Sequence, residues 1–148
     1  MVVRERILDN IETTLKGIKT VDGYNENVGL VTREIYNWTN LSPRDKPAVI
    51  IQWVQDDKSN DINIEGQHIL SFLRVRIRGV YYSKTDLEGK LNDFLEDIEK
   101  IMSADQTRGG YANYTSPDVI NTYQSESEFN VIFDFDFVIQ YVYVYGSP

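Results

Sequence analysis

The stretch from residue 70 to residue 144 constrains the fold most, because it specifies five structural signals in unbroken succession. In residues 70–82, apolar side chains alternate with arginines, which is typical of a strand with one buried face. Residues 86–102 carry a continuous apolar stripe at helical spacing, so we expect an amphipathic helix that packs on a sheet. The loop 105–110 contains two adjacent glycines and indicates a helix-to-strand turn that needs positive φ or close backbone approach.

Two strands complete this stretch. We expect the shorter one at residues 119–123, after Pro117, and the longer one at residues 129–144. The longer strand shows a clear period of two. Its apolar members are Phe129, Val131, Phe133, Phe135, Phe137, Ile139, Tyr141 and Tyr143. The polar residues that alternate with them are Asn130, Asp134, Asp136 and Gln140.

The second predicted helix begins with what has the form of a capping box. Thr85 precedes the helix and Glu88 follows three residues later, so we expect the Thr85 side chain to cap the first turn. The residues of the apolar stripe are Leu87, Leu91, Phe94, Leu95, Ile98 and Met102.

The first half of the chain predicts one more helix and two more strands. Apolar spacing over residues 3–18 predicts the helix, and Gly17 is expected to mark its end; a strand of imperfect period follows at residues 27–38. Residues 41–47 contain two prolines and indicate a turn, because proline does not fit inside a central strand. A short apolar strand is expected at residues 48–54, and the acidic residues 55–66 indicate a long hairpin loop. The apolar face of the helix consists of Val3, Ile7, Leu8, Ile11, Leu15 and Ile18.

The predicted fold class is therefore α+β. We expect a single domain over residues 1–148, built from one antiparallel or mixed sheet with two helices packed on one face. The expected order of elements is α-β-β-β-α-β-β.

Composition excludes several classes of function. The chain has no cysteine, so thiolate metal sites, disulfides and cysteine nucleophiles are excluded. The single histidine, His68, is expected to be a partly exposed loop residue rather than a catalytic one. A net charge of −8 disfavours tight binding to nucleic acid. The charged first six residues do not form a secretory signal, and no stretch is apolar enough to span a membrane. We expect a soluble intracellular protein with no membrane partner.

Two charged rows are the main candidates for chemistry. Asp134 and Asp136 project from one face of a strand about 7 Å apart, a spacing that a divalent cation can use. Arg74, Arg76 and Arg78 form a matching basic row, and the two rows would pair if their strands are neighbours. The arginine row also fits a phosphate-binding stripe or a subunit interface. Of these interpretations, pairing across the sheet is the preferred one.

No recognised catalytic motif is present in the sequence. Arg108-Gly109-Gly110 lacks the Lys-Ser/Thr pair of a phosphate loop and leaves a helix rather than entering one. Nucleophile elbows, zinc-protease helices and dinucleotide-binding turns are missing as well. We therefore expect a protein that is not an enzyme and that uses no cofactor and no metal.

The order of these segments resembles a known family. Pro47-Ala-Val-Ile-Ile51 precedes a polar loop and an alternating strand that ends in Arg78-Gly-Val-Tyr81. A helix that starts Asp86-Leu, the turn Asp105-Gln-Thr-Arg-Gly-Gly110 and a closing aromatic strand follow. Together these features resemble the tail terminator, or tail completion, proteins of long-tailed bacteriophages. Members of that family often have a hydrophobic residue before the two glycines, where this chain has Arg108.

The resemblance implies a structural role in the virion. Such proteins form a ring, commonly a hexamer, at the head-proximal end of the tail, after assembly in the host cytoplasm. The ring ends polymerisation of the tail tube protein and presents the surface for head-tail joining. Its partners would be other copies of itself, the tail tube protein, a neck or head-completion protein and, in contractile tails, the sheath. DNA would pass through the channel without specific binding.

By the same analogy, we expect subunit or assembly contacts at the sheet edges, the charged rows and the acidic loop. The candidate residues are Arg74, Arg76, Arg78, Asp134, Asp136, Asp56, Asp57 and Asp61. Two alternatives remain open at this point. One is a head-completion or neck protein of the same connector region. The other is a small metal-binding enzyme that uses Asp134 and Asp136.

Overall fold

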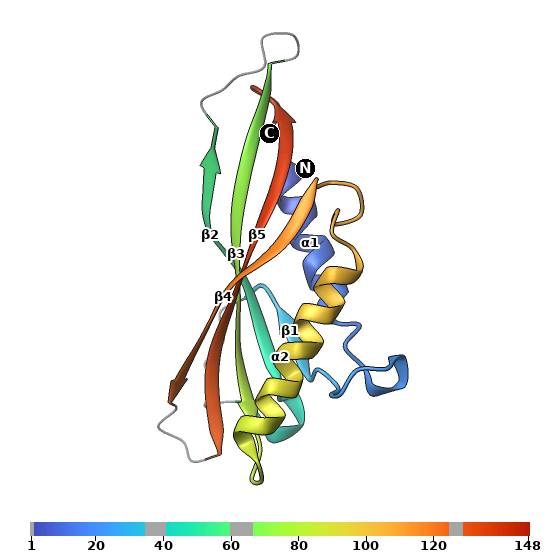
Figure 1. Cartoon of the computed structure of the whole chain (residues 1–148), viewed down its shortest axis with the longest axis vertical. Coiled ribbons are helices and arrows are strands. Elements are labelled where there is room, and N and C mark those ends of the chain that lie inside the picture. The colour runs from blue at the N-terminus through green and yellow to red at the C-terminus, as the bar shows by residue number, and fades with distance from the viewer. Residues whose placement is uncertain (1, 35–40, 60–66, 125–128) are drawn as a thin grey trace.

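The computed structural model describes residues 2–34, 41–59, 67–124 and 129–148 (Figure 1). Its elements, in chain order, are α1 (Val3–Leu15), a 3₁₀ turn (Thr20–Asp22), β1 (Leu30–Thr32), another 3₁₀ turn (Pro43–Asp45), β2 (Ala48–Lys58), β3 (His68–Tyr82), α2 (Leu87–Ala104), β4 (Tyr114–Gln124) and β5 (Asn130–Val144). The predicted α+β class is confirmed. The observed order differs from the expected one by the two short 3₁₀ turns.

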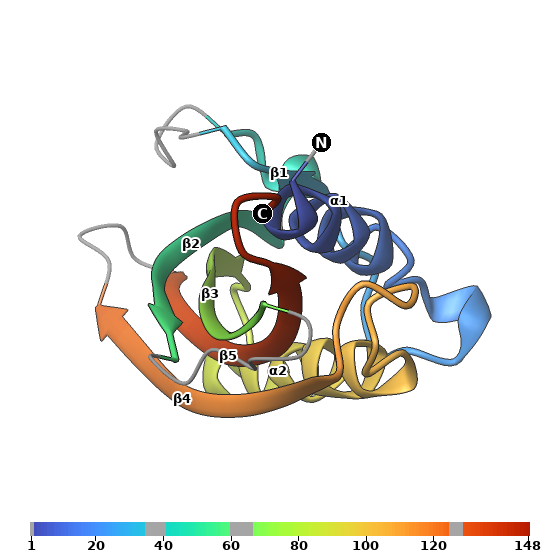
Figure 2. The ribbon, with the colours of Figure 1, turned by 90° about the horizontal axis from the view of Figure 1, so that it is seen from above.

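The strands form one mixed sheet in the order β1-β2-β3-β5-β4. The short β1 pairs in parallel with the start of β2, and the other three neighbouring pairs are antiparallel. The central pair is β3 with β5, and it aligns fifteen residues of each strand without a bulge. The sheet twists strongly, as the end-on view in Figure 2 shows.

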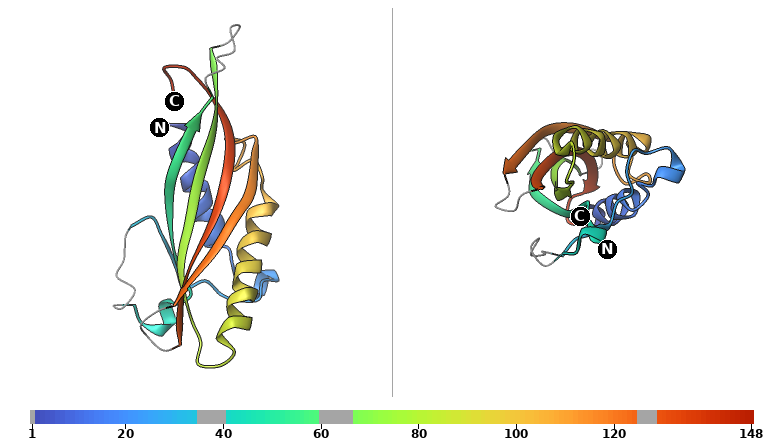
Figure 3. Two further views of the ribbon diagram at one scale, coloured as in Figure 1. Left: turned by 60° about the vertical axis from the view of Figure 1, so that its left-hand side comes forward. Right: turned by 90° about the horizontal axis from the view of Figure 1, so that it is seen from below.

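Both helices pack on the same face of the sheet, as expected (Figure 3). The alternation in β3 and β5 places one side-chain row of each strand under the helices, while the opposite rows carry the charged residues. Phe94 of α2 lies between Tyr81 and Phe133, with ring centroids 5.8 and 5.9 Å apart. Ile7 and Ile11 of α1 are fully buried in the same core. The predicted apolar faces of both helices are thus confirmed.

Glycine is required at position 79, where β3 lies between β2 and β5. A Cβ at this position would lie 2.4 Å from the ring of Phe133 and 2.8 Å from the carbonyl oxygen of Ala48. The absence of a side chain on β3 therefore lets the Phe133 ring fill this part of the core.

Three sequence-based boundaries were wrong. The strand expected at residues 27–38 forms only at Leu30–Thr32 within the described residues, and positions 35–38 lie outside them. The loop expected at residues 55–66 begins later, because β2 continues to Lys58; residues 60–66 are not among the described ones. The strand expected at residues 119–123 starts at Tyr114 and includes Pro117. Proline is tolerated there because β4 is an edge strand and bulges just after it.

The prediction that Thr85 caps the second helix was also wrong. The helix starts at Leu87, so Asp86 is the N-cap residue, with a left-handed φ of 46° and no side-chain capping bond. Thr85 is one residue too early to cap, and its amide instead donates to the Ser83 hydroxyl at 3.2 Å.

The Gly-Gly turn is confirmed. Gly109 and Gly110 have φ values of 70° and 90°, in the left-handed region that glycine adopts without strain. In the described part of the chain, no helix is long and apolar enough to span a membrane.

Candidate functional site

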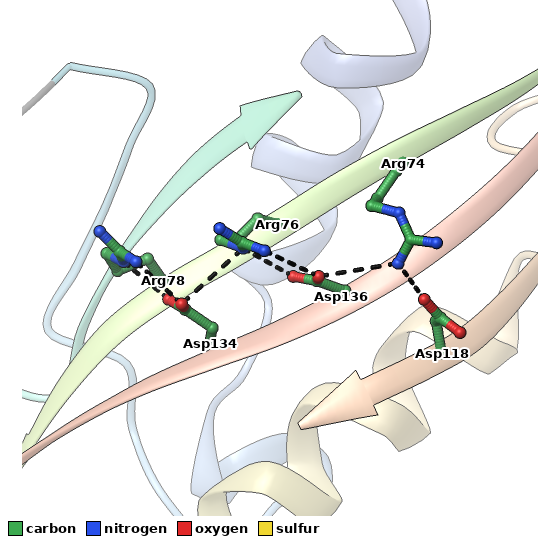
Figure 4. Close-up of polar contacts among 6 residues, drawn as sticks. All are labelled: Arg74, Arg76, Arg78, Asp118, Asp134 and Asp136. Atoms are coloured by element: carbon green, nitrogen blue, oxygen red, sulfur yellow. Dashed lines mark hydrogen bonds and ion pairs between the residues drawn. The ribbon is translucent and has the colours of Figure 1, made fainter. Parts of the chain in front are cut away.

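The two charged rows lie on neighbouring strands and pair with each other (Figure 4). Arg76 is opposite Asp136 in the β3–β5 register, and Arg78 is opposite Asp134. The Arg76 guanidinium donates to both oxygens of Asp136, at 2.9 and 3.1 Å. Arg78 donates to both oxygens of Asp134, at 2.7 and 2.8 Å. The predicted cross-strand pairing is therefore confirmed.

These pairs are linked into one network, which we call the charge zipper, of Arg74, Arg76, Arg78, Asp118, Asp134 and Asp136. Its diagonal contacts are longer. Arg76 lies 3.8 Å from an oxygen of Asp134, and Arg74 lies 3.8 Å from an oxygen of Asp136. Arg74 also forms an ion pair with Asp118 on β4. The zipper therefore spans three adjacent strands, and its three positive and three negative charges balance.

Burial within the charge zipper is unequal. The side chains of Asp134 and Asp136 are only 1% and 3% exposed, whereas that of Arg78 is 40% exposed. Burial alone would raise the pKa of Asp134, but the hydrogen bonds and charge of Arg78 outweigh it and lower that pKa. The bond to Asp134 raises the pKa of Arg78 in turn. The more exposed arginines cover the two buried carboxylates.

This geometry bears on the metal and phosphate interpretations of the rows. Guanidinium groups hold both oxygens of each carboxylate, so a cation would have to displace an arginine to bind. Across the described residues, no cluster of three or more His, Asp or Glu side chains could hold a metal ion. The donors that Arg76 and Arg78 direct at aspartates are likewise not available to a phosphate.

A second polar cluster surrounds Asp56 on the helix-covered face of the sheet. Oxygen Oδ2 of Asp56 accepts hydrogen bonds from Tyr141 at 2.6 Å, from Arg4 at 3.0 Å and from Lys58 at 3.0 Å. The side chain of Asp56 is only 4% exposed, and its other oxygen is buried without a hydrogen-bond partner in the structure described. Burial opposes ionisation, but the bonds from Tyr141, Lys58 and Arg4 lower the pKa of Asp56. The cluster ties the first turn of α1 to β2 and β5.

Ser71 belongs to the Asp56 cluster and gives it the outline of a Ser-Lys dyad. The Lys58 amine donates to the Ser71 hydroxyl at 2.9 Å and to Tyr141 at 3.0 Å. A general base in such a dyad needs a lowered pKa. Burial alone would lower the pKa of Lys58, but its bonds with Tyr141 and Asp56 raise it. Ser71 is also fully buried, so the arrangement is suited to structural support rather than nucleophilic attack.

The other acidic candidates are dispersed. Asp57 is exposed, and its two oxygens accept bonds from the Gln55 side chain at 2.7 and 2.8 Å. Asp61 lies outside the described residues. His68 is exposed at the first residue of β3. The structure therefore brings the charged rows together but keeps Asp56 and Asp57 on opposite faces of β2.

Sequence reasoning missed the burial of Arg108. Its side chain is fully buried and donates to the carbonyl oxygen of Met102 at 2.5 Å, at the C-terminal end of α2. Burial lowers the pKa of Arg108, and the nearby Asp105 charge opposes that effect. The negative end of the helix dipole stabilises a cation at this position. The turn that contains the two glycines thus also supplies the side chain that caps the C-terminal end of α2.

The sheet has two open edges in the described structure, one along β4 and one along the second half of β2. β4 is the terminal strand, so its eleven residues have one neighbour, β5. On the opposite side, β1 pairs with β2 only as far as Ile50. Residues 51–58 therefore pair with β3 on one side and have no strand partner among the described residues on the other. Large hydrophobic side chains are exposed by 41–49% on these two strands: Trp53, Val54, Tyr114, Val119, Ile120 and Tyr123.

Surface hollows flank both open edges. One hollow of about 360 Å³ lies beside β2 and is lined by Arg33, Ile51, Gln52 and Trp53. Two others lie between α2 and β4. The hollow near the end of α2 has a volume of about 360 Å³, and the hollow near its start about 420 Å³.

Comparison of the chain with models of known protein families and with curated proteins found no match.

Proposed function

We propose that the protein is a structural component of a bacteriophage tail that assembles into a ring at the head-proximal end of the tail tube. There it ends polymerisation of the tube and offers the surface for head-tail joining. The order of segments in the sequence motivates this proposal, and the open edge of β4 is the structural observation that supports it most directly.

The β4 edge favours self-association for a physical reason. An exposed strand presents unpaired backbone donors and acceptors, which pair readily with another strand. Soluble proteins protect long edges with charges, prolines or bulges. β4 has Pro117 and a bulge in its first half, but residues 119–124 contain neither proline nor charge. An edge of this kind suits a protein whose working state is an assembly.

The charge balance also suits a ring around DNA. The charge zipper is neutral as a unit, so the net charge of −8 resides in the rest of the chain. An acidic surface repels the phosphate backbone and lets it pass without binding.

The metal-binding alternative has less support, because Arg76 and Arg78 occupy the carboxylates that it requires. Calorimetric titration with magnesium, calcium and manganese tests it. Binding that disappears in the Asp134→Ala, Asp136→Ala double variant would favour the alternative over a structural role.

Two experiments test the proposed function. The mass of the purified protein in solution should exceed the 17.2 kDa of one chain by an integral factor. In a phage that encodes the protein, removal of its gene should give overlong tails in electron micrographs. Normal-length tails without heads would instead indicate a neck protein. A strict monomer that is absent from virions would refute both roles.

A further inference from the structure

The geometry points to the seam between subunits: the β4 edge of one copy pairs antiparallel with residues 51–58 of β2 in the next copy. This inference rests on the proposed self-association and adds the surface that carries it. It joins two different edges of the chain, so each copy uses both of its open edges.

Strand direction supports this pairing. β2 is antiparallel to β3, β3 to β5, and β5 to β4, so β4 and β2 of one copy run in opposite directions. A second copy placed beside the first in the same orientation therefore brings its β2 antiparallel to β4. The helix-covered faces of the two sheets then lie on the same side, and the sheet continues from copy to copy.

The two edges also match in length. Residues 52–58 of β2 and residues 118–124 of β4, which follow Pro117, permit a ladder of about seven residues, roughly 24 Å long at the usual rise of a strand. In the register that places Gln55 opposite Asn121, the exposed Trp53 and Val54 of one edge would lie near Ile120 and Tyr123 of the other. Pairing would thus cover apolar side chains as well as backbone groups.

Charged side chains flank both edges. Glu96, Glu99 and Lys100 line the hollow near the end of α2, and Glu88 lines the one near its start. Arg33 lines the hollow beside β2, where its guanidinium bonds to Glu5 and Asp9 of α1. Because Arg33 is already paired with two carboxylates, these charges do not distinguish pairing of β4 with β2 from pairing of β4 with itself.

A seam between two different edges has a consequence for assembly. Such a heterologous contact repeats from copy to copy and closes into a ring when the rotation per copy divides a full turn, whereas pairing of β4 with itself would stop at a two-fold dimer. The seam therefore accounts for a ring in a way that a β4–β4 contact does not.

Cross-linking tests the seam cleanly, because the chain contains no cysteine of its own. Gln55→Cys lies on the β2 edge and Asn121→Cys lies on β4, and both positions are exposed. With a short bis-maleimide, the double variant should give a ladder of covalent oligomers, while each single variant should stay monomeric on a denaturing gel. A matched control pairs Asn121→Cys with Val21→Cys, an 89% exposed position away from both edges, and should give no ladder.

The outcomes separate the seam from the proposed function. An oligomer in solution without a Gln55→Cys, Asn121→Cys ladder would overturn the seam and leave the proposed function standing. A covalent dimer of Asn121→Cys alone would also overturn it, because it would indicate β4–β4 pairing. A strict monomer would overturn both. As a second measurement, Ile120→Lys should reduce the mass in solution to 17.2 kDa with an unchanged circular dichroism spectrum, and Val21→Lys should not.

Discussion

Removal of one arginine from the charge zipper should destabilise the fold more than removal of the aspartate that it binds. Arg78→Met deletes two hydrogen bonds of 2.7 and 2.8 Å and leaves the Asp134 carboxylate, 1% exposed, without its main partner. Loss of one partner of a fully buried pair costs about 3–5 kcal/mol. Because Arg78 is 40% exposed and Arg76 stays 3.8 Å from Asp134, we expect a smaller loss, about 2 kcal/mol.

Asp134→Asn should cost less, about 1 kcal/mol, because the exposed Arg78 can turn to water and the amide oxygen still accepts a bond. For a chain of this size, each 1 kcal/mol lowers Tm by about 2–4 °C. The two variants should therefore lower Tm by about 4–8 °C and 2–4 °C. The double variant Arg78→Met, Asp134→Asn no longer contains the buried carboxylate that Arg78→Met alone leaves unpaired, so the two losses should not add.

Urea unfolding followed by circular dichroism measures these free energies. Lys16→Met is the control, because it breaks an exposed ion pair with Glu12 and should change stability by no more than about 0.5 kcal/mol. The lowered pKa of Asp134 means that the pair stabilises above the unfolded pKa of about 3.9 and loses this effect as pH falls through the folded value. The gap between wild type and Arg78→Met should narrow in acid. Equal losses in Arg78→Met and Lys16→Met, or additive losses in the double variant, would refute the reasoning.

Two further predictions concern the core and the Asp56 cluster. Gly79→Ala should lower stability by about 2–3 kcal/mol, because its Cβ would clash with the Phe133 ring. Adding Phe133→Leu to the same chain should recover part of that loss. An unchanged melting temperature in Gly79→Ala would contradict the tight packing. The pKa of Asp56 is lowered and that of Lys58 is raised. The acidic group therefore stabilises above about pH 4 and the basic one below about pH 10. The free energy of unfolding should therefore form a plateau between these two pH values. Asp56→Asn should lose less of this free energy than wild type as pH falls below about 4. The same loss in acid as in wild type would contradict the role given to Asp56.

The sequence predicted the core strands well because their signal is local. In β3 and β5 one face is buried and the other polar, so a period of two is sufficient to identify the strand and its inner side. The sequence did not show that β3 and β5 are neighbours in the sheet, because α2 and β4 lie between them along the chain. The predicted pairing of Arg78 with Asp134 therefore rested on an assumed adjacency of these two strands.

The Asp56 cluster was missed for a specific physical reason. Residues 55–58 are polar, and polar runs favour loops in any sequence-based prediction. A bulge between Trp53 and Gln55 adds one residue to β2 and so reverses the face on which each later side chain lies. Asp56 is therefore opposite Leu73 on the buried side. Alternation counted from Trp53 would have placed Gln55 there instead.

The positions with left-handed backbone were equally hard to predict. Asp86 and Arg108 have positive φ values of 46° and 49°, which residues other than glycine rarely adopt. At Asp86 this conformation moves the helix start by one residue and removes the expected role of Thr85. At Arg108 it directs the side chain into the protein beside Met102. Aspartate adopts this conformation more often than most residues and arginine does not, but neither residue type is sufficient to predict it, so the deciding signal lies in the tertiary structure.

The charge zipper narrows the choice of surfaces for assembly. A partner that bound this face through its charges would have to compete with bonds that the three arginines already make to Asp118, Asp134 and Asp136. Breaking such partly buried pairs costs more than a new surface ion pair returns. Backbone groups on the open edges of β2 and β4 make no such bonds to another strand of the described chain. In the proposed assembly, a neighbouring copy would therefore gain most by approaching from the side and extending the sheet.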